Sequence, residues 1–231
     1  KAAGLAVTNR LIIGDGAGGS QADGVGMLAD NQVTAVTINS SGLWNLGNFE
    51  NEVSDLVLNR GGDVTTGATG KLRLGTGADI TATPGDTPGT VESSISGNLE
   101  LAAGNHRFTV DNGDNTLNNS TLLINAVISG PGGTDKQGRD NLELAGANSF
   151  GGTVAVNSGI LIVNHDLALG LTTSGTRVND SAELRLLADV SGESLTLDSG
   201  GLTPSVPTAL TVSGEQVWTG NVTLLRDTTI R

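Results

Sequence analysis

An identical pentapeptide, Asn-Leu-Glu-Leu-Ala, occurs twice in this chain, at residues 98–102 and again 43 positions later at residues 141–145. Each copy is followed by a phenylalanine at almost the same offset, Phe108 and Phe150. A step of this length corresponds to two turns of roughly 21 residues, the size of one turn in a parallel β-solenoid. Each turn of such a stack buries its apolar face only against its neighbours. The repeat therefore predicts a stacked scaffold in which both copies occupy one column, two turns apart.

The alternation of apolar and polar residues within each copy also predicts which side chains face the core. Successive side chains of a β-strand point to opposite faces, so the two leucines of a copy share one face and the glutamate lies on the other. We expect inward-facing Leu99, Leu101, Leu142 and Leu144, and solvent-facing Glu100 and Glu143. The rings of Phe108 and Phe150 are expected to fill corners of the same core.

Short triplets of the form apolar–x–apolar recur along the whole chain, from residues 11–13 to residues 222–224. This period of two is typical of half-buried strands, and no stretch keeps a helical pattern. The 35 glycines, against 5 prolines, suit frequent tight corners. The chain is therefore predicted to be all-β, a right-handed parallel β-helix of roughly ten rungs, with a sandwich or barrel as the alternative. We expect residues 1–231 to be a single solenoid segment of a longer repeat protein.

A second similarity within the chain involves the two tryptophans. Residues 35–38 and 209–212 are related tetrapeptides, and in both cases a tryptophan follows nine residues after the alanine, at Trp44 and Trp218. Because the spacing of these copies differs from that of the pentapeptide, we expect the turns to be imperfect relatives of one another. Packing at corners is the expected role of both indole rings.

The charge balance limits the partners that the chain can have. With 24 Asp and Glu against 12 Lys and Arg, the net charge is −12, which argues against nucleic acid because phosphate recognition needs a basic surface. It also disfavours anionic membrane surfaces, and no apolar stretch approaches the roughly 18 residues of a membrane span. The absence of cysteine excludes disulfides and cysteine-ligated zinc. We interpret the start at Lys1, without a methionine or signal peptide, as a piece of a longer chain.

Two histidines and one oxygen-rich loop are the candidates for metal ligands. His106 and His165 are 59 positions apart, and we expect both to be exposed turn residues rather than ligands. Residues 111–115 have the oxygen density of a calcium loop but lack the EF-hand spacing that ends in glutamate. Asp111 and Asp114 are therefore weak calcium candidates, and neither a metal nor another cofactor is expected.

β-Helices also carry enzymes that cleave polysaccharides, which need clustered carboxylates and usually aromatic platforms for sugar rings. Glu100 and Glu143 are expected to lie about 10 Å apart, with no arginine in register. Tyrosine is absent. We therefore predict no catalytic residue and no enzyme activity. Side chains such as Asn148, Asn157 and Asn164 are instead expected to form structural ladders at turns.

Residues 128–170 carry the most specific pattern in the chain. It reads as an Ile-Ser-Gly-x-Gly-Gly opening, a Lys and a Gly, an alternating strand that leads to Asn-x-Phe, a Gly-Gly-Thr corner and a final Gly-x-Leu-x-Val strand. This order resembles the autotransporter-associated β-strand repeat of large bacterial surface proteins. The matching positions are Ile128, Ser129, Gly130, Gly132, Gly133, Lys136, Gly138, Leu142, Leu144, Gly146, Asn148, Phe150, Gly151, Gly152, Thr153, Gly159, Leu161 and Val163. The resemblance implies a right-handed β-helical, exported, non-catalytic stalk, and it assigns no catalytic residues.

The resemblance and the composition together favour a structural role. Our first hypothesis is a stalk segment of an autotransporter-like adhesin, exported by bacteria and located at the cell surface or outside the cell. The alternatives are an extracellular fibre subunit that stacks end to end, and a β-helix that binds or cleaves polysaccharides. Both ends of the chain read as strands without a cap. We therefore expect further rungs of the same polypeptide, or other copies, to pair with the open edges.

Overall fold

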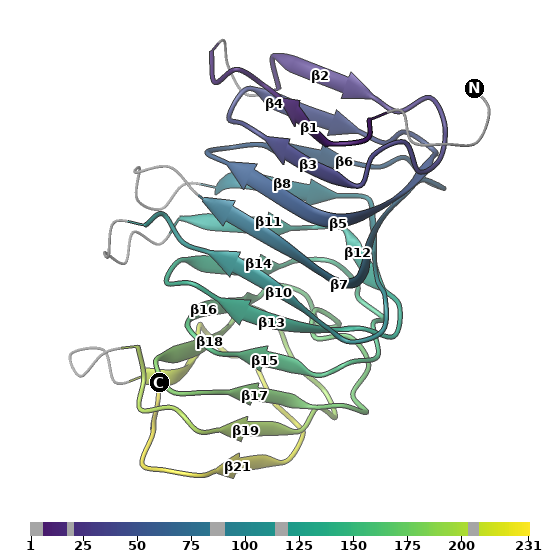
Figure 1. Cartoon of the computed structure of the whole chain (residues 1–231). Helices are drawn as coiled ribbons and strands as arrows, with labels where there is room; N and C mark the ends of the chain where they lie inside the picture. Colours follow the sequence, from purple (N-terminus) through teal and green to yellow (C-terminus); the bar gives the residue numbers. More distant parts are fainter. Residues whose placement is uncertain (1–6, 18–20, 84–90, 114–119, 203–207) are drawn as a thin grey trace.

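The computed structural model describes residues 7–17, 21–83, 91–113, 120–202 and 208–231 of the 231-residue chain. Within these residues all regular structure is β, and the strands pair in parallel. The chain winds as a coil that places strands of each turn in two stacked sheets (Figure 1). Ten strands follow one another along each sheet, so about nine turns separate the first strand from the last. The prediction of an all-β parallel solenoid is confirmed, and its right-handed sense stays a prediction.

The strands divide among two sheets and a shorter third face. Sheet A contains β1 (Arg10–Ile13), β3 (Ala35–Ile38), β5 (Glu50–Asn59), β7 (Lys71–Thr83), β10 (Asn105–Val110), β13 (Gly133–Gln137), β15 (Val154–Val156), β17 (Thr176–Val178), β19 (Leu195–Leu197) and β21 (Val222–Leu224). Sheet B contains β2 (Asp23–Gly26), β4 (Gly42–Asn45), β6 (Asp63–Thr65), β8 (Val91–Ser96), β11 (Thr121–Ile124), β14 (Asn141–Leu144), β16 (Gly159–Val163), β18 (Ala182–Leu186), β20 (Thr208–Val212) and β22 (Thr229–Ile230). The remaining strands are β9 (Asn98–Leu101) and β12 (Val127–Ser129).

The third face connects the end of a sheet B strand to the start of the next sheet A strand. It is built from the first halves of β5 and β7, followed by β9 and β12, and its register joins Leu72 to Leu99 and then to Ile128. The pairing of β5 with β7 shifts register after Val53, where the strands pass from the third face into sheet A. Beyond β12 the face continues through backbone hydrogen bonds between turns, such as that from the N–H of Ser149 to the carbonyl oxygen of Ile128 (2.8 Å).

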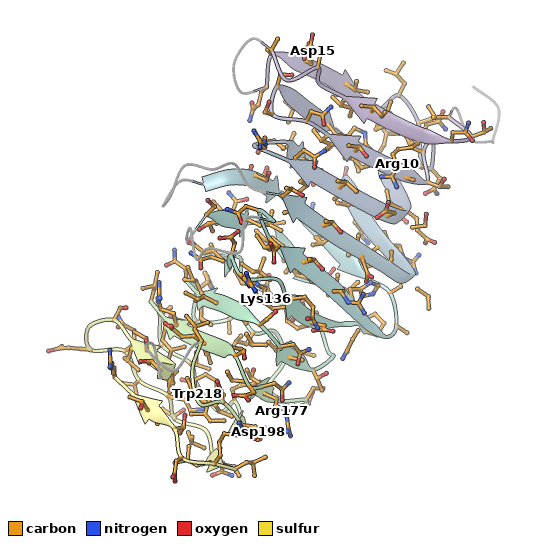
Figure 2. All side chains as sticks on the ribbon, turned by 60° about the vertical axis from the view of Figure 1, so that its left-hand side comes forward. Arg10, Asp15, Lys136, Arg177, Asp198 and Trp218 are labelled. Carbon is orange, nitrogen blue, oxygen red and sulfur yellow. The ribbon has the colours of Figure 1, made fainter. Side chains whose placement is uncertain are left out.

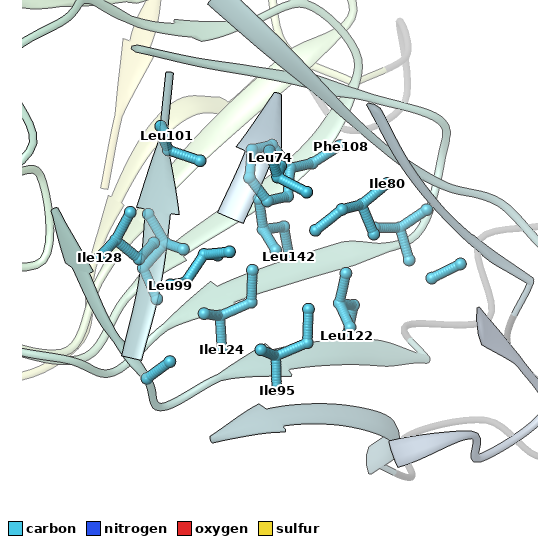
Figure 3. Packing of buried hydrophobic residues seen from close by; sticks show 14 of the residues in the cluster. Leu74, Ile80, Ile95, Leu99, Leu101, Phe108, Leu122, Ile124, Ile128 and Leu142 are labelled. Atoms are coloured by element: carbon cyan, nitrogen blue, oxygen red, sulfur yellow. The ribbon is translucent and has the colours of Figure 1, made fainter. Parts of the chain in front are cut away.

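The core consists of columns of inward side chains that run along the stack. One column of sheet A follows the register from turn to turn through Val36, Leu56, Ile80, Phe108, Lys136, Val156, Val178 and Leu197. All of these residues are buried. Side chains of sheet B, such as Ile95 and Leu122, and of the third face, such as Leu99, point into the same interior (Figure 3). Because each turn covers only its neighbours, the core extends along the molecule and has no single centre.

The two copies of the pentapeptide do not share a column. The first copy forms β9 on the third face, where Leu99 lies in register with Leu72. The second copy forms β14 in sheet B, between β11 and β16. The prediction of one column, two turns apart, is therefore wrong. The leucines of both copies are nevertheless buried, and Glu100 and Glu143 are more accessible than their neighbours, as the alternation predicts.

Unequal turn lengths explain this error. Register partners in sheet A are 28 residues apart at Ile80 and Phe108, but 19 residues apart at Val178 and Leu197. An apolar–x–apolar triplet can form a strand on any of the three faces, since each face has an inward and an outward side. The local pattern thus determines which side chains are buried, but not the face on which a strand lies.

Candidate functional site

Four aromatic residues, Trp44, Phe108, Phe150 and Trp218, were expected to pack at corners, and they lie at different places in the solenoid. Trp44 is within β4 and Phe108 is within β10, so the corner positions predicted for these two residues are wrong. Phe150 lies on the third face, where its carbonyl oxygen accepts a hydrogen bond from the next turn (2.9 Å). Trp218 also lies on the third face, and its Nε1–H donates to the carbonyl oxygen of Glu193 (2.9 Å). The rings of Trp44, Phe108 and Phe150 are fully buried and pack in the core.

Three further repeat positions lie where adjacent turns come into close contact. The Oδ1 atom of Asn148 accepts a hydrogen bond from the N–H of Ile128 (2.8 Å), and its Nδ2 donates to the carbonyl oxygen of Ala168 (2.7 Å). This buried amide therefore connects the turn before it to the turn after it. At Gly146 and Gly152 a Cβ atom would overlap the backbone of the preceding turn, so only glycine fits these two positions.

Asparagine ladders occur, but not at every expected residue. Asn179 donates a side-chain hydrogen bond to Asn157, and Asn157 donates in turn to Asp135, so one polar ladder crosses three turns of sheet A. The Nδ2 of Asn164 instead donates to the carboxylate of Glu143 (2.7 Å). The side-chain amides thus stabilise the stack by joining turns.

His106 is fully buried, and the prediction of an exposed turn residue is wrong. Its Nδ1 and Nε2 atoms lie 2.7 and 2.9 Å from the carbonyl oxygens of Ala78 and Ala102, so the ring connects its own turn to the preceding one. His165 lies in a half-buried turn, with its Nδ1 3.0 Å from the backbone nitrogen of Leu167. The two rings lie on different turns and form no common site.

The weak calcium candidate Asp111 takes part in a local turn. Its Oδ1 accepts a hydrogen bond from the N–H of Gly113 (2.8 Å), and its Oδ2 accepts one from the N–H of Arg139 (3.3 Å). Asp114 lies outside the described residues. Among the residues that the structure describes, no three or more His, Asp or Glu side chains are placed to hold a metal ion.

We expect that removing divalent cations will leave the melting temperature of the chain unchanged. Both oxygens of Asp111 already accept hydrogen bonds, whereas calcium needs about six to eight oxygen ligands. Thermal unfolding followed by circular dichroism, with and without a chelator, measures the effect. A calcium-dependent shift of several degrees would contradict the prediction, and Asp111→Asn would then identify the first ligand.

Several outward acidic side chains pair with basic side chains of neighbouring turns. Glu100 contacts Arg73 (Nε to Oε1, 3.2 Å) and Lys71 (Nζ to Oε2, 2.5 Å), so the expectation that no arginine lies in register is wrong. Arg177 pairs with Asp198 at 2.6 Å on the outward side of sheet A (Figure 2). These pairs connect turns and neutralise part of the acidic surface.

Lys136 lies in the core column of sheet A and is 1% exposed (Figure 2). Its Nζ donates hydrogen bonds to the carbonyl oxygens of Gln137 (2.6 Å), Gly138 (2.7 Å) and Ser158 (3.0 Å). Burial lowers the pKa of Lys136 to about 7, while the nearby carboxylate of Asp140 acts in the opposite direction. The alternation within β13 places this lysine inward, although its charge argues against burial. Its contacts make it a structural link between two turns.

A cleft of about 290 Å³ opens between the turn at residues 166–172 and the turn at residues 189–193. Its lining residues include Asp166, Leu167, Leu169, Asp189 and Glu193. Glu193 is 2% exposed, and its Oε1 accepts a hydrogen bond from the hydroxyl of Thr176 (3.0 Å). Burial raises the pKa of Glu193, which the bond from Thr176 partly opposes. No sequence pattern indicated this group of residues.

The fold and these contacts define a parallel β-solenoid. The aromatic, asparagine and paired charged residues described above pack its core or join its turns. The described residues include no helix that is long and apolar enough to cross a membrane. The chain is similar to the adhesin BmaC autotransporter of Brucella suis biovar 1 (strain 1330), with 32% identity over 181 residues that cover 74% of this chain. The chain spans about 5% of the length of that relative. No protein-family model matches the chain, and no solved structure matches it.

Proposed function

We propose that this chain is a segment of a long, exported bacterial surface protein, in which it serves as a stiff, non-catalytic, adhesin-like stalk. The similarity to an autotransporter adhesin over 74% of the chain is the observation that carries the proposal. A solenoid of stacked turns suits this role, because its length grows with each added turn while its cross-section stays the same. A net charge of −12 favours a segment that resists non-specific association.

The last turn of the described chain supports the view that the stack continues. Val222 and Leu224 of β21 are 44% and 54% exposed, whereas their register partners Leu195 and Leu197 in β19 are buried. The apolar columns therefore reach the end of the stack without a covering turn. We propose that further turns of the same polypeptide cover them.

Antibodies against the folded chain test the surface location. Intact bacteria that produce the parent protein should be labelled without permeabilisation, and external protease should remove the label. An antibody against a cytoplasmic protein, which should label only permeabilised cells, is the control. Labelling that requires permeabilisation would contradict the proposal.

The same exposed end favours end-to-end assembly as a second candidate function. We expect the isolated chain to associate with increasing concentration, because Val222 and Leu224 offer apolar surface beside an unpaired strand edge. Leu224→Glu should abolish this association, since it places a charge in the contact. Leu171→Glu, at a residue 50% exposed on the third face, is the matched control and should associate like the parent.

Sedimentation velocity over a range of protein concentrations measures the assembly. Both substituted residues are half-exposed, so the melting temperatures of the two variants should stay close to that of the parent. A parent chain that stays monomeric at every concentration would exclude the fibre subunit and leave the stalk as the proposed function.

A further inference from the structure

Glu193 lies between two other turns of the solenoid and is almost completely buried. Its Oε1 atom accepts a hydrogen bond from the hydroxyl of Thr176 in the preceding turn (3.0 Å). Its Oε2 atom is also buried and has no hydrogen-bond partner within the described ranges of the chain. An unpaired buried acceptor is costly, and the cost is larger when the group carries a charge. The surroundings of Glu193 therefore favour its neutral form over its ionised form.

Residues 217–221, which belong to the last turn that the structure describes, lie directly against the backbone of Glu193. The Nε1–H of Trp218 donates a hydrogen bond to the carbonyl oxygen of Glu193 (2.9 Å). Gly220 packs so closely that a Cβ atom at this position would overlap the same oxygen. The N–H of Leu195 donates to a carbonyl oxygen of the last turn (2.8 Å). Detachment of the last turn would therefore open Glu193 to water.

The charged side chains described around Glu193 do not favour its ionised form. Residues 217–221 contain no titratable side chain. Arg177 of the preceding turn already pairs with a carboxylate on the outward side of sheet A. Asp166 and Asp189 line the same cleft as Glu193, and like charges disfavour ionisation. Burial raises the pKa of Glu193, and the hydrogen bond to its Oε1 opposes only part of this effect.

We propose that Glu193 makes the attachment of the last turn sensitive to pH. While the turn is attached, the neutral acid is favoured, whereas water hydrates the ionised carboxylate once the turn detaches. Binding of a proton therefore stabilises the contact between residues 217–221 and the turn before them. Because the pKa is raised in the folded chain, this stabilisation grows as the pH falls and is complete below the ordinary value of 4.5. The effect concerns the end of the described stack alone, so its failure would leave the proposed surface role unaffected.

Hydrogen exchange of the isolated chain at a series of pH values tests this link. The amides of Leu195 and Thr219 report the attachment, because their hydrogen bonds join the last two turns. After correction for the intrinsic effect of pH on exchange, their protection factors should rise about tenfold from pH 7 to pH 5, the usual cost of an unpaired buried acceptor. The amide of Ser149, which joins two turns in the middle of the stack, is the control within the same molecule and should change much less.

A substitution assigns the effect to this carboxylate. Glu193→Gln removes the titrating proton but keeps an acceptor for Thr176, so the protection factors of Leu195 and Thr219 should be the same at pH 7 and pH 5. Glu52→Gln, which removes an exposed carboxylate from the third face, is the matched control and should keep the tenfold rise. If Glu193→Gln does not fold, the carboxyl carbon resonance of Glu193 in the parent carries the test, and it should titrate above pH 4.5.

Three results would overturn the proposal. The first is protection of the last turn in the parent that stays constant or falls between pH 7 and pH 5. The second is a rise of equal size in Glu193→Gln, which would assign the effect to other titrating groups such as His165 or Asp166. The third is a carboxyl resonance of Glu193 that titrates at or below pH 4.5, since the buried carboxylate would then favour its ionised form.

Discussion

Replacing Phe150 with alanine is expected to lower the free energy of unfolding by about 3–5 kcal/mol. The ring is fully buried on the third face. The next turn approaches it closely, since a Cβ atom at Gly170 would lie 3.1 Å from two of its ring carbons. Because backbone hydrogen bonds hold neighbouring turns at a fixed spacing, the cavity left by the ring has little room to collapse.

Chemical unfolding of the purified chain measures this effect. Leu171→Ala, which truncates a side chain that is 50% exposed in the following turn, is the control and should change the free energy of unfolding by less than about 0.5 kcal/mol. Hydrogen exchange should increase mainly in the turns that flank Phe150, because a stacked array transmits a defect chiefly to its neighbours. A melting temperature within a degree of the parent would contradict the packing role.

Substitution of Lys136 by methionine is expected to remove a pH dependence of stability. In the folded chain, burial lowers the pKa of this lysine from 10.5 to about 7, although the carboxylates of Asp140, Asp111 and Asp135 oppose the shift. Above pH 7 the unfolded chain therefore holds a proton at this residue that the folded chain has lost, so the free energy of unfolding rises with pH. From pH 7 to 9 the parent should gain about 2–3 kcal/mol, and below pH 7 both states are protonated and the contribution is constant.

This pH window contains few other titrating groups, because the chain has no cysteine and no tyrosine. In Lys136→Met the carbonyl oxygens that the amine contacts lose their donor, which should lower stability at pH 9 by about 1–3 kcal/mol. Lys71→Met is the matched control, since it removes a lysine that is 33% exposed and pairs with Glu100, and it should keep the rise. Denaturant unfolding at a series of pH values measures both effects. Parallel pH profiles for the parent and Lys136→Met would show that the buried amine does not titrate as described.

The strands of this fold can be predicted from alternation alone, but their places in the stack cannot. Leu99 and Leu142 have identical neighbours in the sequence, yet one lies on the third face and the other in sheet B. Their faces depend on the lengths of the corners that precede them and on links between turns. One such link is made by Asn148, which contacts Ile128 and Ala168 on two other turns. A single sequence does not reveal these long-range partners.

Buried polar residues were the hardest features to predict, for two different reasons. In β10 the period-two alternation places His106 inward, on the same face as Phe108. Its polar ring and its polar, exposed neighbours Asn105 and Arg107 nevertheless suggested an exposed turn. Lys136 follows the same rule within β13. Glu193 lies outside any strand, and no periodicity indicates its burial.

The hydrogen bonds between turns run along the length of the stack, because the strands lie across it (Figure 1). A pull on the two ends therefore loads the turns in series, and an end turn, which packs against one neighbour only, detaches first. Each detached turn of 19 to 31 residues releases roughly 60–110 Å of chain, at about 3.3–3.6 Å per extended residue. We therefore expect such a segment to lengthen in steps under tension while its remaining turns stay folded, and so to absorb force.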